Sequence, residues 1–322
     1  MARLSFGAIV ACGLTLASNA ATAAGMAPYE LLDRMNEAVR QLDYEGRFVV
    51  QSADRLDAMY IVHRAMQGIE KERVVSLTGA PREIIRSDEA VACLLPGRDG
   101  HINVGLRANG RSFSPLRGVD GSQLDVSYKI EMLEPERVAG RESYQILIRP
   151  RDDLRYGYRL FVDQASALPL QSIMFDELQR VVSQMMFVEL RIGHAITPIE
   201  HDLSAMQLAR ADPSDRRPVE RFAPPDWVFS KLPPGFRLNV HRRKAVNSAV
   251  GDREHFIFSD GLATVSVYVQ AADGSSALSG VSRLGAAKAV GRVIGEHEVI
   301  VVGEVPTKTL HWFVQHIQAR SP

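Results

Sequence analysis

The side chains in this 322-residue chain that first suggest chemistry are a few histidines, the pair Ser259-Asp260 and two cysteines. His255 precedes Ser259-Asp260 by four residues, a grouping that would suggest a nucleophile with a nearby base. Gly261 follows directly, and serine, aspartate and glycine in succession are typical of a tight turn, where the aspartate bonds its own backbone. We therefore interpret Asp260 as a turn former and predict no catalysis at this position.

The other histidines offer no better arrangement. His311 and His316 are five residues apart on an expected helix, so they point in different directions and make a poor metal-binding pair. His297 lies between two glutamates at an expected turn, where a solvated side chain is the simpler interpretation. The chain also lacks the sequence motifs of zinc proteases, thiol redox proteins, serine hydrolases and nucleotide-binding loops. We expect no metal, no cofactor and no enzymatic activity, which leaves binding proteins as the class to consider.

The first 24 residues have the composition of a cleavable export signal. Arg3 supplies a positive charge, residues 4–17 are mainly apolar, and small residues then lead up to Ala23 and Ala24. We predict cleavage after Ala23 or Ala24, with residues 1–24 as the signal peptide. The exported protein is expected to be soluble, because the apolar stretch is shorter than the roughly 20 residues of a membrane helix.

The two cysteines do not form an internal disulfide in this interpretation. Cys12 ends the stretch Ile9-Val10-Ala11-Cys12, which resembles a lipoprotein cleavage site, but cutting there would leave an apolar region of only about eight residues. Cys12 is therefore expected to leave with the signal, and Cys93 has no partner. Cys93 lies in the apolar run 91–95, which predicts a buried strand residue rather than a nucleophile, because no histidine is adjacent.

The mature chain is long enough for two domains. A polar, proline-rich stretch at 211–230 predicts an extended linker, since prolines remove backbone donors and interrupt helices and central strands. It separates a first domain at 25–210 from a second domain at 231–322. A linker of this kind is a candidate hinge between the two.

The two halves of the chain differ in charge. Residues 24–210 hold 23 Lys and Arg against 27 Asp and Glu, whereas residues 211–322 hold 14 against 11. The basic excess includes the cluster His241-Arg242-Arg243-Lys244, which would suit an acidic partner or an anionic lipid headgroup, although a solvated loop explains it equally well. No stretch resembles a nucleic-acid-binding module, and nucleic acid is not expected as a partner.

The first domain should consist of one helix followed by a long antiparallel meander. Residues 28–42 place apolar side chains at helical spacing, after which the hydrophobic period changes to two. About ten strands are too many for a flat open sheet, so the sheet should curl. We predict strands at 48–50, 59–62, 73–77, 83–86, 90–94, 126–130, 144–148, 158–162, 170–175 and 184–190.

A curled sheet of this kind could hold an apolar ligand on its concave face. Several methionines in the predicted strands would suit such an adaptable surface. Our candidates for pocket-lining residues are Phe48, Val50, Tyr60 and Val62. Packing under the helix is the alternative role for the same side chains.

The second domain is predicted to be a small antiparallel sheet with a helix on one face. Strands are expected at 236–240, 255–258, 263–270, 286–293 and 298–305, and Pro306 should open a C-terminal helix. Together with the first domain, this predicts an α+β protein that is mainly β. The apolar stripe of the C-terminal helix consists of Leu310, Phe313, Val314 and Ile317.

Short motifs in both domains show a resemblance to a known family. In the first domain they are Tyr44-Glu45-Gly46-x-Phe48, Glu72-Arg73, Leu77-x-Gly79-x-x-Arg82-Glu83, Tyr156-Gly157-Tyr158-Arg159-Leu160 and Leu168-Pro169-Leu170. In the second they are Leu232-Pro233-x-Gly235-Phe236, Phe258-Ser259-Asp260-Gly261-Leu262-Ala263 and Val302-Gly303-Glu304-Val305-Pro306. Taken in this order, they resemble the MucB/RseB family of periplasmic regulators of envelope-stress sigma factors. Ala167 departs from the pattern, in which a glycine is usual at that turn.

The resemblance implies a fold, a location and a pair of partners. The first domain would be an unclosed antiparallel β-barrel of the LolA/LppX-like kind, with a pocket for lipid or lipoprotein acyl chains. In the periplasm, the second domain would bind the periplasmic domain of a membrane-bound, RseA/MucA-like anti-sigma factor. It would shield that factor from proteolysis until lipopolysaccharide or a mislocalised lipoprotein releases it. Homo-oligomerisation stays open.

The second domain offers two sets of candidate residues for that partner, Arg242 with Arg243 and the turn Phe258, Ser259, Asp260, Gly261 and Leu262. A plain hairpin is the alternative for the turn. A periplasmic lipid or lipoprotein carrier without a signalling role is the alternative for the whole protein.

Overall fold

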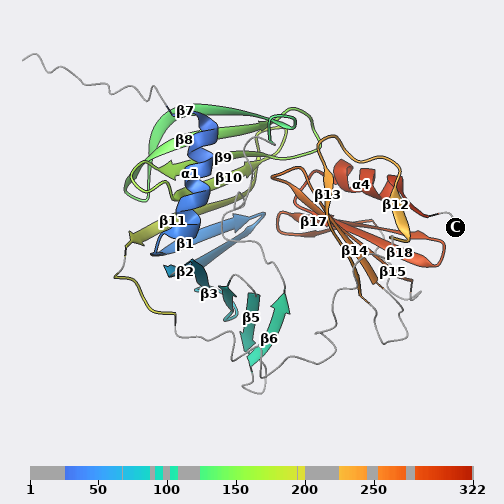
Figure 1. The fold of residues 1–322 in the computed structure, drawn as a ribbon, viewed down its shortest axis with the longest axis horizontal. Helices are drawn as coiled ribbons and strands as arrows, with labels where there is room; N and C mark the ends of the chain where they lie inside the picture. Colours follow the sequence, from blue (N-terminus) through green and yellow to red (C-terminus); the bar gives the residue numbers. More distant parts are fainter. Residues whose placement is uncertain are drawn as a thin grey trace, which may run out of the picture.

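The computed structural model shows two β-rich domains side by side (Figure 1). In the described residues, the first domain has a large sheet with helix α1, and the second has a smaller sheet with helix α4. The signal peptide and most of the predicted linker lie outside the described residues. The structure describes residues 26–66, 68–87, 91–96, 102–107, 124–193, 195–199, 225–244, 253–272 and 280–320.

The first domain is an 11-stranded antiparallel sheet with the order β6-β5-β4-β3-β2-β1-β11-β10-β9-β8-β7. Because β1 pairs with β11, the last strand returns to the first, while β6 and β7 remain at the two edges and the barrel stays open. The predicted unclosed barrel is confirmed. Its strands are β1 (Tyr44–Ser52), β2 (Arg55–Met66), β3 (Ile69–Ser76), β4 (Glu83–Ser87), β5 (Val91–Pro96), β6 (Ile102–Arg107), β7 (Tyr128–Val138), β8 (Arg141–Pro150), β9 (Gly157–Asp163), β10 (Pro169–Phe175) and β11 (Val181–Ile192).

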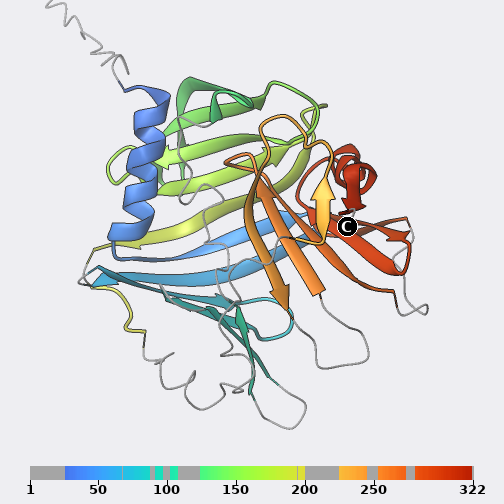
Figure 2. The same cartoon turned by 45° about the vertical axis from the view of Figure 1, so that its right-hand side comes forward.

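Helix α1 (Pro28–Gln41) lies across the concave side of this curved sheet, as the view in Figure 2 shows. Pro28 occupies its first turn, where a missing N–H costs nothing, and Leu42 ends it with a backbone bond to Ala38 O at 3.1 Å. The predicted helix is thus confirmed. Its apolar stripe packs into the core of the domain and consists of Leu31, Leu32, Met35, Ala38 and Val39.

Ten of the eleven strands match the predicted ones, and β6 is the strand that the sequence did not suggest. Its alternating apolar residues are interrupted by Gly105, which weakens a strand pattern. Cys93 lies in β5 and pairs through its backbone with Ile84 and Gly105. Its predicted place in a strand is confirmed, whereas its side chain lies outside the described parts.

The second domain is a six-stranded antiparallel sheet with the order β13-β14-β15-β18-β17-β16, to which a short β12–β19 pair is added. The predicted hairpins and the C-terminal helix are present. Residues 227–229 form a strand of this domain, so the described end of the predicted linker 211–230 belongs to the second domain instead. The elements are β12 (Trp227–Phe229), β13 (Arg237–Lys244), β14 (Arg253–Ser259), β15 (Thr264–Ala271), β16 (Val281–Leu284), β17 (Ala287–Ile294), β18 (His297–Gly303), α4 (Thr307–His316) and β19 (Ile317–Ala319).

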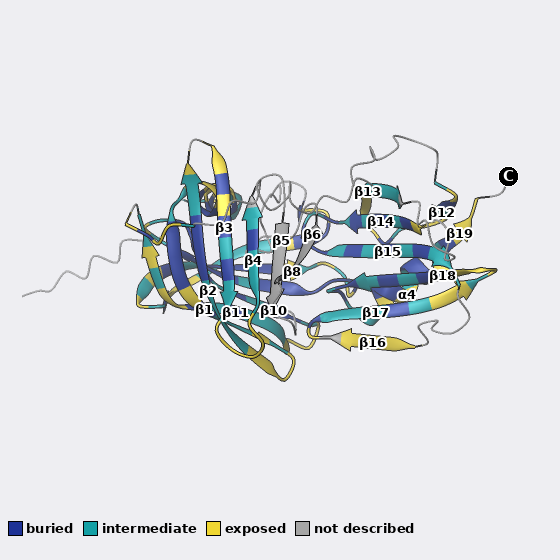
Figure 3. Ribbon diagram, turned by 90° about the horizontal axis from the view of Figure 1, so that it is seen from below, coloured by how far each residue is buried: buried dark blue, intermediate teal, exposed yellow. Residues whose placement is uncertain are grey.

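Among the described residues, the core of the second domain lies on one face of its sheet. Helix α4 packs on β17 and β18, and Phe229 of β12 stacks edge-on against Phe258 on the same side. Three residues of the predicted stripe, Leu310, Phe313 and Val314, are buried in α4. The fourth, Ile317, is buried too but begins β19, because the helix ends at His316. The two sheets lie end to end, and exposed residues gather at strand ends and along β16 (Figure 3).

Candidate ligand pocket and domain interface

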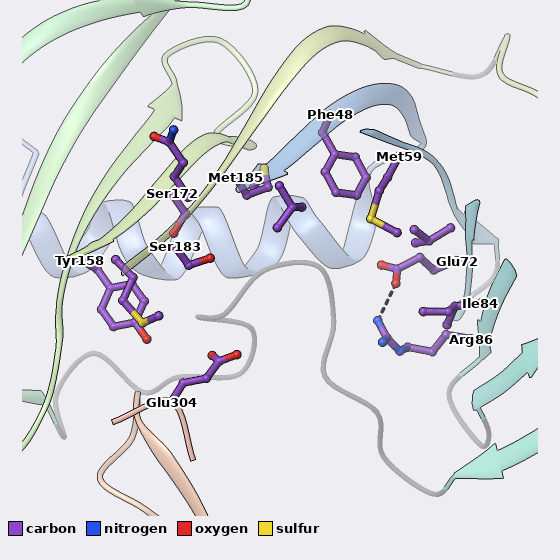
Figure 4. Close-up of a pocket in the computed structure, with 14 residues that line it drawn as sticks. Phe48, Met59, Glu72, Ile84, Arg86, Tyr158, Ser172, Ser183, Met185 and Glu304 are labelled. Atoms are coloured by element: carbon purple, nitrogen blue, oxygen red, sulfur yellow. Dashed lines mark hydrogen bonds and ion pairs between the residues drawn. The ribbon is translucent and has the colours of Figure 1, made fainter. Parts of the chain in front are cut away.

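The inner side of the first sheet holds a pocket of about 290 Å³ next to α1 (Figure 4). Its wall is mainly apolar and includes Phe48, Met59, Met174 and Met185. Methionine side chains adapt to irregular apolar partners, and a concave apolar wall of this size is typical of small-molecule sites. The pocket can therefore take an apolar chain, in line with a ligand on the concave face.

One buried ion pair interrupts the apolar wall. Glu72 of β3 is only 3% exposed, and its Oε1 accepts a hydrogen bond from Arg86 Nη1 of β4 at 2.5 Å. Burial raises the pKa of Glu72, while the positive charge of Arg86 acts in the opposite direction. The pair places a carboxylate and a guanidinium at one end of the cavity, whereas Ser172, Ser183 and Glu304 line it at the other end (Figure 4).

The second domain completes the pocket. Glu304, which follows β18, lines the cavity from the side opposite the wall of the first domain (Figure 4). A molecule in the pocket would thus contact both domains. This shared wall is the structural link between ligand binding and the position of the second domain.

Of the four predicted lining residues, Phe48 and Val50 line the pocket and Tyr60 and Val62 do not. In the β1–β2 register Phe48 pairs with Met59, so Met59 faces the cavity and its neighbour Tyr60 faces the opposite side. The prediction chose the wrong face of β2, because both faces of this strand carry apolar residues. Successive side chains of a strand point to opposite faces of the sheet. Assigning the cavity face to residues that are off by one position therefore assigns every side chain of the strand to the wrong face.

On that opposite face, Tyr60 donates a hydrogen bond from its hydroxyl to Glu45 Oε2 at 2.5 Å, and Val62 is fully buried. Burial opposes the ionisation of Glu45, but hydrogen bonds from Tyr60 and Thr197 leave its pKa below the usual value. These residues support the outer side of the barrel.

Sequence reasoning missed Glu72, Arg86 and Glu304. The signal for Glu72 was present, since Glu70 and Glu72 occupy positions in β3 that alternate with exposed residues and precede the buried Val74. Acidic residues at inward positions of a strand are unusual and mark a site that needs a partner. Glu304 could not be found from the sequence, because it reaches the cavity from a different domain.

The two domains meet at a second buried ion pair. Asp260 and Arg155 have fully buried side chains, and Arg155 Nη1 donates to Asp260 Oδ2 at 2.6 Å. Tyr128 of the first domain donates its hydroxyl to the same oxygen at 3.0 Å. Burial raises the pKa of Tyr128 well above its usual value and the charge of Asp260 raises it further, so Tyr128 stays a donor.

Asp260 and Arg155 each form further hydrogen bonds with neighbouring residues. The other oxygen of Asp260 accepts backbone N–H bonds from Leu262 at 2.9 Å and Ala263 at 2.7 Å, which confirms Asp260 as a turn former. Arg155 bonds both oxygens of Asp152 and donates to Pro234 O at 2.6 Å. Buried charges persist when their hydrogen bonds are satisfied in this way.

Further contacts extend the interface on both sides of the ion pair. Thr309 of α4 donates its hydroxyl to Leu154 O at 2.5 Å, and Lys288 Nζ donates to Tyr156 Oη at 2.8 Å. Leu262 is buried in the core of the first domain although it belongs to the second. Polar and apolar contacts together thus hold the two domains in one relative position.

The residues predicted for partner binding occupy two different environments. In the turn, Phe258 lies in the core of the second domain, and Asp260, Gly261 and Leu262 face the first domain. Ser259 donates its hydroxyl to Ala263 O at 2.8 Å within the turn. In this arrangement the turn binds the first domain of the same chain and offers these side chains no free surface for a separate partner.

The two arginines lie on β13, away from this turn. Arg243 bonds Asp226 and Glu254 within the second domain, the latter at 3.2 Å. Arg242 is half-buried and pairs across the strands with His255, whose ring stacks on Tyr268 at a centroid distance of 4.2 Å. Arg242 is therefore placed on a different side of the sheet from the ion-paired Arg243.

Arg242 belongs to the sheet face opposite α4. In the described part of the chain, no helix packs on this face, and its residues are half-buried rather than buried. The strand registers place the following side chains together on it, and we call them the helix-free face: Val240, Arg242, His255, Ile257, Ser266, Tyr268, Ile300 and Val302. It combines an aromatic ring, apolar side chains and a basic group, as protein-binding surfaces commonly do.

The groups first considered for chemistry are used structurally. His255 stacks on Tyr268 and Ser259 bonds its own turn, so neither contributes to a nucleophile–base pair. Among the described residues, no three His, Cys, Asp or Glu side chains gather closely enough to hold a metal ion. Within the same residues, no helix has the length and apolar character needed to cross a membrane.

The fold and the two sites define a class of protein: a two-domain binding protein in which an open barrel with an apolar pocket is joined to a small sheet domain. Two family models match the chain, the MucB/RseB N-terminal domain over residues 27–209 and the MucB/RseB C-terminal domain over residues 221–318. The chain belongs to the MucB/RseB family.

Individual relatives agree with this assignment. The sigma factor AlgU regulatory protein MucB of Pseudomonas aeruginosa is 29% identical over 311 residues, which cover 95% of this chain and 93% of the relative. The structure of the Pseudomonas aeruginosa MucA/MucB complex matches with a TM-score of 0.69 and 27% identity, covering 92% of this chain and 99% of that one. A structure of MucB in complex with MucA(peri) matches with a TM-score of 0.68 and 26% identity, covering 92% and 100%.

Proposed function

We propose that this protein is an exported sigma-factor regulator that binds the periplasmic part of a membrane-bound anti-sigma factor and releases it when an acyl chain enters the pocket. The observation that carries the proposal is the apolar cavity of the first domain, which Glu304 of the second domain completes. The names of its relatives support the regulatory role, since they are sigma-factor regulators and one was solved with MucA(peri).

In this role the protein works by binding alone. The groups that could have formed a catalytic site are used in turns and stacking contacts, as described above. While the anti-sigma segment is bound, the protein shields it from proteolysis, and release exposes it. The predicted signal peptide would bring the protein to the periplasm, where both the segment and misplaced lipids are found.

The shared pocket wall gives the mechanism its physical basis. A ligand changes an equilibrium only by the difference between its affinities for the two states. An acyl chain in the cavity contacts Glu304, so it binds most tightly to the domain arrangement that tolerates its presence there. If the anti-sigma segment favours the other arrangement, each ligand weakens the other by the same factor, commonly about 5- to 150-fold.

We place the anti-sigma segment on the helix-free face. Its apolar and aromatic residues include Ile257, Tyr268 and Ile300, and Arg242 adds a positive charge. Aromatic and arginine side chains contribute strongly to protein interfaces. The turn Phe258–Leu262, which we first considered for this partner, is occupied by the first domain in this arrangement.

The direct test measures binding of the mature protein to the immobilised periplasmic segment, with and without lipopolysaccharide. We expect binding without lipid and a loss of at least about tenfold in affinity with it. Arg242→Glu should weaken binding, whereas Arg283→Glu, the same charge change on an exposed residue of β16, should not. A protein that takes up lipid but never binds the segment would be a lipid carrier, and the regulatory proposal would fail.

A further inference from the structure

We infer that Glu72 makes the pocket prefer ligands in which an apolar chain carries a neutral hydrogen-bond donor, either a hydroxyl or an amide N–H. This inference rests on the proposed function of the pocket and states which amphiphiles it prefers. Glu72 Oε2 is buried and has no hydrogen-bond partner among the described residues, although the carboxylate lines the cavity.

An unpartnered carboxylate oxygen inside a protein is unfavourable. Buried polar groups are almost always hydrogen-bonded, and a charged acceptor left without a donor costs more than a neutral one. Only the other oxygen, Oε1, is satisfied, by Arg86 at 2.5 Å. A ligand that donates to Oε2 would remove this cost, and the broad terminal torsion of glutamate lets the oxygen turn toward it.

The charge of the preferred ligand follows from the pair itself. Glu72 and Arg86 together carry no net charge, so a charged headgroup beside them would remain uncompensated in an apolar cavity. A neutral donor satisfies Oε2 without adding charge. A carboxylate headgroup would instead bring a like charge to Glu72.

The surrounding wall decides where the chain of such a ligand lies. Val74 and Ile84, neighbours of the pair on β3 and β4, face the same cavity, and Met59 and Phe48 continue the apolar wall beyond them. A donor bonded to Glu72 therefore directs the chain along this apolar wall. Acyl amides and hydroxylated chains have this arrangement, and plain esters lack the donor.

The test uses the full mature protein with N-phenyl-1-naphthylamine, a neutral apolar fluorophore, as the probe. Displacement is measured with four ligands of equal chain length: lauryl alcohol, N-methyl lauramide, methyl laurate and laurate. We expect the alcohol and the amide to bind about tenfold more tightly than the ester, since a hydrogen bond to a charged group is worth that much or more. The ranking in the unmodified protein needs no variant and is decisive alone.

A double variant, Glu72→Met with Arg86→Met, assigns the preference to the pair. Replacing a buried ion pair by apolar residues of similar volume is often neutral for folding, so this variant should still bind methyl laurate. The alcohol and amide should lose their advantage. The control Arg73→Met with Glu83→Met removes a pair at 2.6 Å on the outer face of the same strands and should keep it.

Each outcome has a distinct meaning. Equal binding of ester and amide, or an advantage that survives in the Glu72 double variant, would overturn the inference and leave the pocket intact as an apolar site. Tightest binding of laurate would show that Arg86 selects an anion, which also overturns it. If no laurate derivative displaces the probe, the proposed acyl-binding function fails together with the inference.

Discussion

Asp260 shows how one residue can serve a local turn and a domain contact at the same time. One carboxylate oxygen accepts two backbone N–H bonds of the turn, and the other accepts bonds from Tyr128 and Arg155 of the first domain. Sequence reasoning found the first role, because an aspartate before a glycine is a local signal. The second role depends on Arg155, which lies 105 residues earlier in the chain, and no local pattern points to it.

The variant Asp260→Asn measures how much the Asp260–Arg155 ion pair contributes to the free energy of unfolding. Asparagine keeps an acceptor for the turn, but its amide NH2 then faces the donors of Arg155 and Tyr128, and the negative charge is lost. We expect the free energy of unfolding to fall by about 3 kcal/mol in urea titrations. The matched control is Asp153→Asn at the exposed edge of the same interface, where losing the ion pair to Lys308 should cost less than about 1 kcal/mol. Equal losses in the two variants would contradict a dominant role for the buried pair.

Two alanines in the left-handed region give a second test at the residue scale. Ala53 (φ 53°) and Ala167 (φ 62°) both adopt a conformation that favours glycine. Ala53 is exposed, so Ala53→Gly should stabilise the protein by roughly 0.5–1 kcal/mol. Ala167→Gly should change stability by less than about 0.5 kcal/mol, because the buried methyl group that it removes offsets the relief of backbone strain. Thermal unfolding of both variants checks this difference.

At the scale of elements, the sequence predicts what depends on local periodicity and misses what depends on register. Helix α1, helix α4 and most strands follow from the spacing of apolar residues. The choice of Tyr60 in place of Met59 failed because β2 is apolar on both faces, and only its pairing with β1 decides which side faces the cavity. The placement of Glu304 in the pocket needs the relative position of two domains, which periodicity does not contain.

Four of the motifs that carried the family resemblance lie at or near the contact between the domains. Tyr156 bonds Lys288, Gly235 lies against Ser127, and Asp260 bonds Arg155. Glu304 lies at the neighbouring cavity. These segments belong to different strands and loops, so their shared position suggests that the interface is the part of the molecule on which function depends.

His255 lies on the helix-free face, and its contribution to the stability of the fold depends on pH. Burial lowers the pKa of His255 below its ordinary 6.5, and the nearby charge of Arg242 lowers it further. The unfolded chain therefore takes up a proton first as the pH falls. The stability that neutral His255 contributes is complete above about pH 6.5 and is lost as the pH falls through the lower folded-state pKa.

We expect His255→Phe, which keeps the stacking on Tyr268, to flatten the dependence of unfolding free energy on pH below about 6.5. Urea unfolding of both proteins across this range gives the comparison, and the difference between the two curves isolates His255 from other titrating groups. Parallel curves would mean that His255 does not contribute. A steeper curve for the variant would reverse the assigned sign.

At the scale of the whole molecule, the domain interface and the pocket are coupled, because both depend on the relative position of the two domains. The buried ion pair holds the domains in one relative position, and the pocket opens next to the same contact through Glu304. A ligand that enters the pocket therefore acts on the domain arrangement directly. We expect Glu304→Ala to keep ligand binding and segment binding but to reduce the lipid-triggered loss of affinity severalfold, since it removes the second domain from the ligand contact. Binding assays for each ligand alone and together measure this coupling.

Fixing the domains by a covalent bond separates coupling from binding. A Cβ added at Gly235 would lie 3.6 Å from Cβ of Ser127 across the interface, which is a distance suited to a disulfide. Gly235 has a φ of 79°, so a cysteine there costs about 1–2 kcal/mol of backbone strain, and the oxidised variant is compared with its own reduced form. We expect the variant Ser127→Cys with Gly235→Cys, made on a Cys93→Ala background, to bind both the anti-sigma segment and the acyl ligand when oxidised. In that state the ligand should no longer release the segment, because the domains cannot rearrange, and reduction of the same sample should restore release. Release from the oxidised protein would show instead that the ligand acts without moving one domain against the other.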